Sequence, residues 1–330
     1  MKPSLPVIAI VTPFLAGANN GNWRTAHRWQ TLLQGHYKVF VGDSWPLAPH
    51  HPVDAMIALH ARRSADSVEL FHRQYPEKPL IVTLTGTDIY RDVADNAAAQ
   101  SSIAVADALV VLQEDAISMV PQALRRKTHV IFQSAKPLLP AQKAKGKLDC
   151  VVVGHLRPEK DPQTVFRLAG LIPPAAPIQL LHIGAAQDDQ LAAEARRVAA
   201  KNSHYHWAGA MTHGLTRAAI KRAHLLIHPS VMEGGANVIV EAISAGTPVL
   251  ASHISGNIGM LGKDYEGYFP VGDAHALWLL LERCLKDSNF LSRLRSACAA
   301  RAVLFRPETE CARLCQMLGQ LLQPARQNRL

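Results

Sequence analysis

Short apolar runs alternate along the chain with longer segments in which apolar residues recur at helical spacing. In the first half, the apolar runs predict strands over Val7–Val11, Lys38–Val41, Ala55–Leu59, Leu80–Leu84, Ala108–Leu112 and His129–Phe132. The intervening segments predict helices over Arg24–Gln34, Ser64–Tyr75, Val93–Ala104 and Asp115–Leu124. Continuously apolar strands separated by helices are typical of a parallel sheet that is covered on both faces. The first half is therefore predicted to be a doubly wound α/β domain.

The alternation stops over residues 134–147 (SAKPLLPAQKAKGK), where Pro, Lys and Gly predict a linker, and then resumes. The second set of strands is predicted over Asp149–Val153, Ile178–Ile183, Tyr205–Ala208, Leu225–His228 and Pro248–Ala251, and the helices over Gln163–Leu171, Gln187–Ala200, Thr216–Arg222 and Asn237–Ser244. From Asp273 onward the chain is predicted to be mostly helical.

These patterns predict two tandem domains. We expect a Rossmann-like N-terminal domain over 1–135, a linker over 136–147, a Rossmann-like C-terminal domain over 148–305, and a helix within 306–330 that packs back on the first domain. Open α/β sheets bind ligands at the carboxyl ends of their strands. Two such sheets that face each other are expected to define one interdomain cleft.

Composition and charge limit the kinds of binding partner that we expect for this protein. The chain of 330 residues is 48% hydrophobic and 18% charged, which excludes a disordered or fibrous protein. Its formal charge of +9 suggests phosphate-bearing partners. There are 16 basic and 11 acidic residues up to Lys147, and 19 and 15 after it, so neither half is a dedicated basic module. We therefore expect no nucleic-acid partner and favour small phosphorylated substrates.

The cysteines and the apolar segments indicate the cellular compartment of the protein. Five cysteines without framework spacing indicate a reducing compartment, and no apolar stretch reaches the roughly 20 residues of a membrane span. We interpret Leu5–Ala18 as a buried first strand and not as a signal peptide, so a cytoplasmic protein is expected. Cys311 and Cys315 share one helix face. Two thiols there could bind metal, but helix packing is favoured because no His or Cys pair lies nearby in sequence.

The segment after Leu225–His228 carries the most informative motif. Residues 228–242 (HPSVMEGGANVIVEA) end a strand, pass a glycine pair and begin a helix near Asn237. This layout directs backbone N–H groups and the positive end of the helix dipole at a ligand, for which phosphate is well suited. Glu241 would accept hydrogen bonds from a ribose diol, and Glu233 would hold sugar hydroxyls. Taken alone, the two carboxylates fit equally well with a solvent-facing Glu233 and a helix-stabilising Glu241.

The motif resembles the signature of the retaining glycosyltransferases of the GT-B type, as in family 4. That signature has two glutamates separated by seven residues, then Glu-Ala, a small-residue helix end and Gly-x-Pro-Val, as in Glu233, Glu241 and Gly246–Val249. The resemblance implies a GT-B fold, an α/β architecture of two Rossmann-like doubly wound domains facing an interdomain cleft. It also implies that Gly234, Gly235 and Ala236 bind the donor together with Glu233 and Glu241.

Residues 154–162 (GHLRPEKDP), directly after a predicted strand, match a second segment of that family. The resemblance implies that Gly154, Arg157 and Lys160 bind the donor and that the two cations contact its diphosphate. A leaving nucleoside diphosphate gains negative charge in the transition state, so fixed cations there lower the barrier. Catalysis without an obligatory metal or cofactor is therefore expected. The predicted catalytic residues are Arg157, Lys160, Glu233 and His60.

Three segments at predicted strand ends of the first domain supply the remaining candidates: NGNWRTAHRW from Asn20, LHARRSADS from Leu59 and TLTGTDIYRD from Thr83. His60 matches the position at which many relatives contact the donor sugar. The relatives' His-Gly-x-Asp stands here as Thr85-Gly86-Thr87-Asp88. The candidate acceptor-binding residues are Gly21, Asn22, Arg24, Thr25, Arg28, Arg62, Thr87, Asp88 and Arg91.

Together, these three segments resemble the selenosugar synthase family of selenoneine biosynthesis. The resemblance implies transfer of a sugar, typically N-acetylglucosamine, from a UDP-sugar to selenophosphate, with release of UDP and phosphate and formation of a 1-selenosugar. A selenium anion needs cations to hold it and no base, whereas a hydroxyl acceptor would need one, which Asp88 could supply.

Three alternatives remain at this point. They are a generic GT-B glycosyltransferase with a sugar or lipid hydroxyl acceptor, a UDP-sugar 2-epimerase, and a nucleic-acid-binding protein. The preferred UDP-sugar, the anomeric outcome and the oligomeric state are left open.

Overall fold

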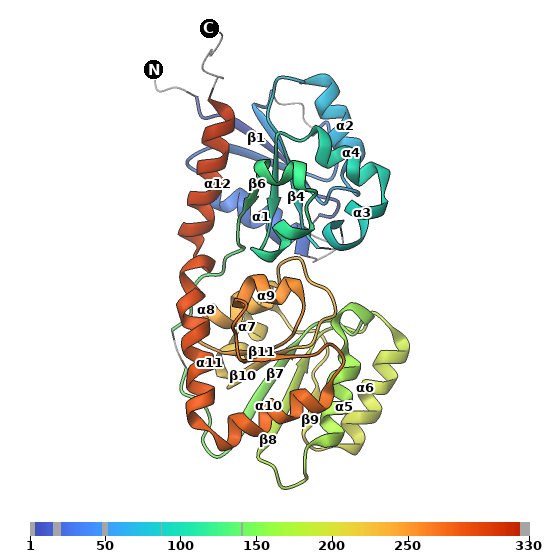
Figure 1. Ribbon diagram of the computed structural model, residues 1–330, viewed down its shortest axis with the longest axis vertical. Helices are drawn as coiled ribbons and strands as arrows, with labels where there is room; N and C mark the ends of the chain where they lie inside the picture. Colours follow the sequence, from blue (N-terminus) through green and yellow to red (C-terminus); the bar gives the residue numbers. More distant parts are fainter. Residues whose placement is uncertain (1–3, 16–20, 48–51, 87, 140, 324–330) are drawn as a thin grey trace. The chain divides into compact units, whose positions relative to one another are not determined.

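The structure, a computed structural model, describes residues 4–15, 21–47, 52–86, 88–139 and 141–323 (Figure 1). The chain forms two compact units: unit 1 comprises Met1–Gln133 and Pro307–Leu330, and unit 2 comprises Ser134–Arg306. Within the described residues, each unit has a six-stranded sheet in which all neighbouring strands are parallel. The predicted α/β fold class with two doubly wound sheets is confirmed.

The sheet of unit 1 has the strand order β2-β1-β3-β4-β5-β6. Its strands are β1 (Val7–Val11), β2 (Lys38–Gly42), β3 (Ala55–Leu59), β4 (Leu80–Leu84), β5 (Ala108–Val111) and β6 (Thr128–Val130). Every residue of β3, β4 and β5 is buried. This explains why these strands are apolar without alternation, since both faces of the sheet are covered.

Helices pack on both faces of this sheet. They are α1 (Gly21–Leu33), α2 (Ala65–Gln74), α3 (Val93–Asp95), α4 (Ala97–Val105) and α12 (Pro307–Leu322). Phe71 of α2 and Ile103 of α4 belong to one core cluster, whereas Trp29 of α1 and Met317 of α12 belong to the other. The last helix of the chain is thus part of the core of unit 1, beside its first helix (Figure 1).

A buried carboxylate fixes α12 to α1. Glu310 is 1% exposed. Its oxygens accept hydrogen bonds from Arg28 Nε at 2.9 and 3.1 Å and from Trp29 Nε1 at 2.7 Å. Burial of a charge is tolerated where it is paired and hydrogen-bonded, as it is here. Glu310 therefore sets the position of α12 along α1.

The sheet of unit 2 has the order β12-β11-β10-β7-β8-β9. Its strands are β7 (Leu148–Val153), β8 (Ile178–Ile183), β9 (Tyr205–Trp207), β10 (Leu225–His228), β11 (Val249–Ser252) and β12 (Tyr268–Phe269). Its helices are α5 (Pro162–Leu171), α6 (Asp189–Lys201), α7 (His213–Arg222), α8 (Asn237–Ser244), α9 (Ser255–Leu261), α10 (Ala274–Lys286) and α11 (Ser288–Arg301). Across the described parts of both units, no helix is long and apolar enough to cross a membrane.

The described part of 134–147 has no helix or strand. The segment is nevertheless held on unit 2, because Lys143 Nζ donates to the carbonyl oxygens of Lys221 and Ala223 at 2.7 and 2.6 Å. These carbonyls lie at the end of α7, where a cation is favourable.

Two predicted helices differ from the structure. Asp115–Leu124 forms two 3₁₀ helices, Asp115–Met119 and Gln122–Lys127, separated by Pro121, which has no N–H to continue a helix. Val93–Ala104 is interrupted at Asn96, whose side chain accepts a hydrogen bond from Ala99 N and starts α4. The sequence pattern also missed α9 and β12, which are too short to show a clear period.

Candidate active site

Two loops of unit 2 meet where the strand order changes direction. β7 pairs with β8 on one side and with β10 on the other, so the chain first runs outward to β9 and then returns to β10. Residues 154–161 follow β7 and residues 229–236 follow β10. Because both strands are parallel, the two loops lie at the same edge of the sheet. Open α/β sheets bind ligands at such a point.

Close backbone contacts shape the loop after β7. A Cβ atom on Gly184, just after β8, would lie 1.8 Å from the carbonyl oxygen of Gly154, so the position requires glycine. At the other end of the loop, Asp161 has φ 42° and its carboxylate caps α5 by accepting a hydrogen bond from Thr164 N. These contacts fix the backbone on both sides of Arg157 and Lys160.

A buried histidine supports the same loop from β8. His182 Nε2 lies 3.2 Å from the Gly154 carbonyl oxygen, and Nδ1 lies 3.0 Å from the Tyr205 hydroxyl. Burial lowers the pKa of His182 to about 4, against the opposing effect of the Gly154 carbonyl. The ring is therefore neutral at pH 7 and acts as a hydrogen-bonding spacer between β8 and the loop.

Lys160 and Glu233 join the two loops. Lys160 Nζ donates to Glu233 Oε1, and His228 Nε2 lies 3.3 Å from the same oxygen. Burial by itself would raise the pKa of Glu233, but the Lys160 ammonium and His228 outweigh it and hold that pKa well below its usual range. Glu233 is therefore a carboxylate at neutral pH and can accept hydrogen bonds but cannot donate one.

Backbone packing fixes the position of Glu233. Val231 N donates to the Glu159 carbonyl oxygen at 3.0 Å, which ties the two loops together. A Cβ atom on Gly256 of α9 would lie 2.0 Å from the Glu233 carbonyl oxygen, so α9 approaches the loop closely only because this residue is glycine. Lys160 and Glu233 are thus held together by main-chain contacts as well as by their charges.

Several buried polar atoms near these strand ends have no hydrogen-bond partner within the described residues. They are Arg157 Nε, Ser230 Oγ, Ser255 Oγ and Asn257 Oδ1. Their residues follow β7, β10 and β11, which are neighbours in the sheet. In addition, α8 begins at Asn237, and Ala236 before it provides no side-chain cap for the first N–H groups. Arg157, Lys160 and these N–H groups suit an anionic ligand rich in oxygen.

The second predicted glutamate has a partner that the sequence did not reveal. Glu241 Oε1 of α8 lies 2.7 Å from His213 Nε2 of α7. The Glu241 side chain is 11% exposed, whereas that of His213 is 54% exposed. The contact orients the carboxylate on α8. The predicted role of Glu241 on a ribose diol stays a prediction, as do those of Gly234, Gly235 and Ala236, which directly precede α8.

In unit 1, His60 follows β3 in a strained conformation. Its φ is 74°, which is uncommon for a residue other than glycine and is often found at functional sites. The residue is 4% exposed, and Nδ1 accepts a hydrogen bond from Arg63 N at 3.4 Å. Burial lowers the pKa of His60, while nearby Asp88 opposes this shift. The imidazole is therefore neutral at pH 7.

Asp88 serves the backbone of the loop after β4. It is fully buried. Its oxygens accept hydrogen bonds from the N–H groups of Ala61, Thr85 and Gly86 at 2.7–3.2 Å. The carboxylate thus connects the loops after β3 and β4 and is not exposed as a general base. Thr87, a candidate acceptor ligand, lies outside the described residues.

Two acceptor candidates on α1 make contacts that hold unit 1 together. Arg28 Nε is paired with Glu310 and so helps to hold α12, while Arg28 Nη2 is buried and has no hydrogen-bond partner within the described residues. The buried hydroxyl of Thr25 donates to the Gly21 carbonyl oxygen at 2.9 Å and accepts from Gln133 Nε2 at 2.7 Å. Both side chains therefore contribute to the fold, and their predicted acceptor roles stay predictions.

The other acceptor candidates remain predictions. Gly21, Asn22 and Arg24 lie in the first turn of α1. Arg62 Nε lies 3.0 Å from Asp92 Oδ2, with 44% of the Arg62 side chain exposed. Arg91 lies in the π-helical turn Asp88–Asp92 that follows β4.

Sequence reasoning missed His228, which contacts Glu233, His213, which contacts Glu241, and Asn257 of α9, whose Oδ1 is buried without a partner within the described residues. His228 was included only as the end of a strand, and His213 and Asn257 were not considered. The contacts of His213 and Asn257 depend on how α7 and α9 pack, which no local pattern encodes. For His228, the signal was present, because a polar residue that ends a buried strand points to a ligand edge.

Comparison with known proteins finds a family that unit 2 resembles. Residues 139–302, all within unit 2, match the family model described as Glycosyl transferases group 1. No curated protein matches the sequence significantly.

Solved structures of glycosyltransferases share the fold along nearly the whole chain. A sucrose-phosphate synthase from Thermosynechococcus elongatus has a TM-score of 0.73 at 19% identity, over 96% of this chain and 99% of that chain. HepE from Anabaena in complex with UDP-glucose has a TM-score of 0.70 at 16% identity, over 96% and 100%. A glycosyltransferase from Rickettsia africae has a TM-score of 0.75 at 12% identity, over 97% and 100%. The fold is therefore that of the GT-B glycosyltransferases.

Proposed function

We propose that this protein transfers N-acetylglucosamine from its UDP donor to selenophosphate and so makes a 1-selenosugar. The observation that carries the donor half is the contact between Lys160 and Glu233 across the loops after β7 and β10. Arg157 Nε, which has no partner within the described residues, and the uncapped start of α8 supply further donors for a diphosphate. HepE, which has the same fold, was solved with UDP-glucose, and this supports a UDP-sugar donor.

The proposed reaction needs cations at the leaving group and no base at the acceptor. The bond between the anomeric carbon and the UDP oxygen breaks, and its electron pair leaves with UDP. A selenium lone pair forms the new carbon–selenium bond, and water then cleaves the selenium–phosphorus bond to release phosphate and leave a selenol on the sugar. Arg157 and Lys160 would stabilise the charge that develops on UDP, so we propose that no metal or organic cofactor is obligatory.

The surroundings of Asp88 favour selenophosphate over a hydroxyl acceptor. A hydroxyl group must lose its proton as it attacks, which calls for an accessible base. Asp88 is the carboxylate that the sequence offers for this role, but it is fully buried and bonded to backbone N–H groups. An anionic selenium nucleophile has no such requirement. The odd number of cysteines supports a reducing compartment, and we propose a cytoplasmic location.

The test is an assay of the purified full chain with UDP-N-acetylglucosamine and a panel of other UDP-sugars, each with and without selenophosphate. We expect release of UDP that depends on selenophosphate, a product with the mass of a selenosugar, and no increase in rate on adding Mg²⁺ or Mn²⁺. Equal release of UDP with and without selenophosphate, and no selenium in the product, would contradict the proposal.

The alternatives give different outcomes in the same assay. A hydroxyl-acceptor glycosyltransferase would release UDP only when a sugar or lipid acceptor is added. A 2-epimerase would release UDP without any acceptor and invert C2 of the sugar, which a proton NMR spectrum of the product detects.

A further inference from the structure

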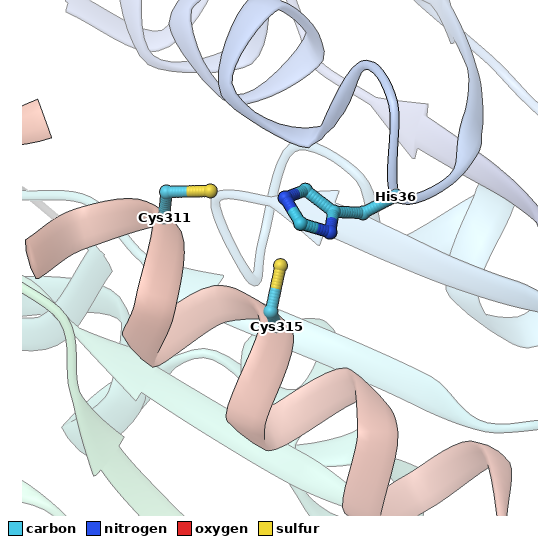
Figure 2. A group of neighbouring side chains, drawn as sticks. All are labelled: His36, Cys311 and Cys315. Atoms are coloured by element: carbon cyan, nitrogen blue, oxygen red, sulfur yellow. The ribbon is translucent and has the colours of Figure 1, made fainter. Parts of the chain in front are cut away.

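Three potential metal ligands from distant parts of the sequence meet on unit 1. Figure 2 shows His36, just after α1, facing Cys311 and Cys315 on α12. The ligand atoms of the three residues all lie within 4.8 Å of one another. The cysteines are four residues apart and so share one helix face. Sequence reasoning had found no histidine near this pair, and the fold now supplies one.

The turn between α1 and β2 places His36. Gly35 has φ 92°, which reverses the chain after Leu33. The N–H groups of His36 and Tyr37 both donate to the Leu33 carbonyl oxygen at 3.0 Å. The turn is therefore tight, and it holds the imidazole close to the end of α1.

The other two ligands are fixed by the docking of α12. Glu310, the residue before Cys311, is bonded to Arg28 and Trp29 of α1. Cys311 Sγ also donates to the Leu32 carbonyl oxygen at 3.2 Å. Both sides of the cluster are thus positioned by contacts other than those within the cluster, as a preformed site requires.

We propose that His36, Cys311 and Cys315 bind one zinc ion, which ties α12 to the turn between α1 and β2. Two thiolates and one imidazole are a donor set that zinc prefers, and each thiol loses its proton on binding. With bonds of about 2.3 Å to sulfur and about 2.0 Å to nitrogen, tetrahedral ligand atoms lie roughly 3.5–3.8 Å apart. Because the ligand atoms already lie within 4.8 Å of one another, they need to approach by no more than about 1.3 Å.

The position of the cluster makes the role structural. His36 precedes β2, so it lies at the amino end of the strands of unit 1, whereas His60 and Asp88 follow strands at their carboxyl ends. The ion would therefore be remote from the predicted acceptor ligands. The fourth zinc position is left to water, because the three residues supply three ligand atoms and His36 is exposed. A chelator is therefore expected to remove the ion from the folded protein.

The experiment uses the reduced full chain without a polyhistidine tag and Co²⁺ as the spectroscopic probe. We expect one equivalent of Co²⁺ to produce a thiolate-to-cobalt charge-transfer band and Zn²⁺ to abolish it. Zinc at a concentration about 100-fold above its dissociation constant should raise the melting temperature by about 5–10 °C.

Substitutions locate the ligands. Cys311→Ser, Cys315→Ser and His36→Ala should each weaken Co²⁺ binding by about tenfold or more. His206→Ala, an exposed histidine on β9, is the matched control and should bind as the wild type does. Serine keeps a donor toward the Leu32 carbonyl, so the melting temperature without metal should change little in Cys311→Ser.

Two results would overturn the proposal. One is the absence of a thiolate band in the reduced wild-type protein at one equivalent of Co²⁺. The other is a band that persists in the Cys311→Ser/Cys315→Ser double variant, because the metal would then be bound by Cys150, Cys284 or Cys298, which are buried in unit 2. Neither result depends on the identity of the sugar donor or acceptor.

Discussion

The two units are both built on a six-stranded parallel sheet, with different strand orders, but they use charged residues differently. In unit 2, Lys160 and Glu233 come from separate loops at the edge where ligands bind, beside the uncapped start of α8. In unit 1, Arg28 is paired with Glu310 on α12, and the carboxylate of Asp88 holds backbone N–H groups. Similar residue types therefore form a candidate ligand site in one unit and mainly maintain the fold in the other. The difference lies in what the paired groups hold, which is two loops at the carboxyl ends of the strands in unit 2 and the last helix or a loop backbone in unit 1.

The largest effect that we expect is a loss of turnover on substitution of Lys160 in unit 2. Lys160→Ala should reduce turnover by about 10²–10³-fold, because it removes a fixed cation from the developing charge on UDP. The measurement is the steady-state rate of UDP release at saturating substrates.

Two further variants show whether this loss is local. Lys147→Ala removes a half-exposed lysine that pairs with Asp149 at the start of β7, the strand whose other end leads into the Lys160 loop. This variant should leave turnover unchanged. Lys160→Ala also deprives Glu233 of its cation, so the Lys160→Ala/Glu233→Gln double variant should recover stability but not activity. Recovery of activity in the double variant would mean that Lys160 acts only by neutralising Glu233.

In unit 1, we expect the substitution of Arg28 to reduce stability. Arg28→Ala leaves the buried Glu310 without its cation and should cost about 3 kcal/mol of unfolding free energy, or about 6–12 °C in melting temperature. The KM for the UDP-sugar and for the acceptor should not change. Arg73→Ala, which breaks an exposed pair with Glu69 on α2, is the matched control and should shift the melting temperature very little. A higher acceptor KM with unchanged stability would instead support the predicted role of Arg28 at the acceptor.

The pH dependence of stability provides a third test. Because the pKa of His182 is lowered to about 4 in the folded protein, the unfolded chain takes up a proton below about pH 6.5 while the folded protein does not. Stability should therefore fall as the pH drops from about 6.5 to 4, by up to about 3 kcal/mol from this residue. His182→Gln should flatten the fall in melting temperature over this range. An unchanged slope in the variant would assign the acid sensitivity to other groups.

The parts that sequence predicts well are those encoded locally. β1 and β3 have the predicted bounds because each is a continuous apolar run between turns. The Lys160 and Glu233 loops could be located because each follows such a strand. The partner of Arg28 could not be predicted from the sequence, because Glu310 reaches Arg28 only when α12 packs on α1. For the same reason His36 could not be joined to Cys311 and Cys315.

The smallest predicted effect concerns an ion pair of unit 1 that lies near strand ends and whose arginine is exposed. The Arg62 side chain is 44% exposed and pairs with Asp92 at 3.0 Å, so Arg62→Ala should change the unfolding free energy by less than about 1 kcal/mol. If Arg62 binds the anionic acceptor, the same substitution should raise the KM for selenophosphate about tenfold, the loss of one charge-assisted hydrogen bond, with little change in kcat. Asp92→Asn frees the guanidinium from its partner and should lower that KM. Equal increases in KM for the UDP-sugar and for selenophosphate in Arg62→Ala would contradict an acceptor role and leave unit 1 without an assigned cation from the loop after β3.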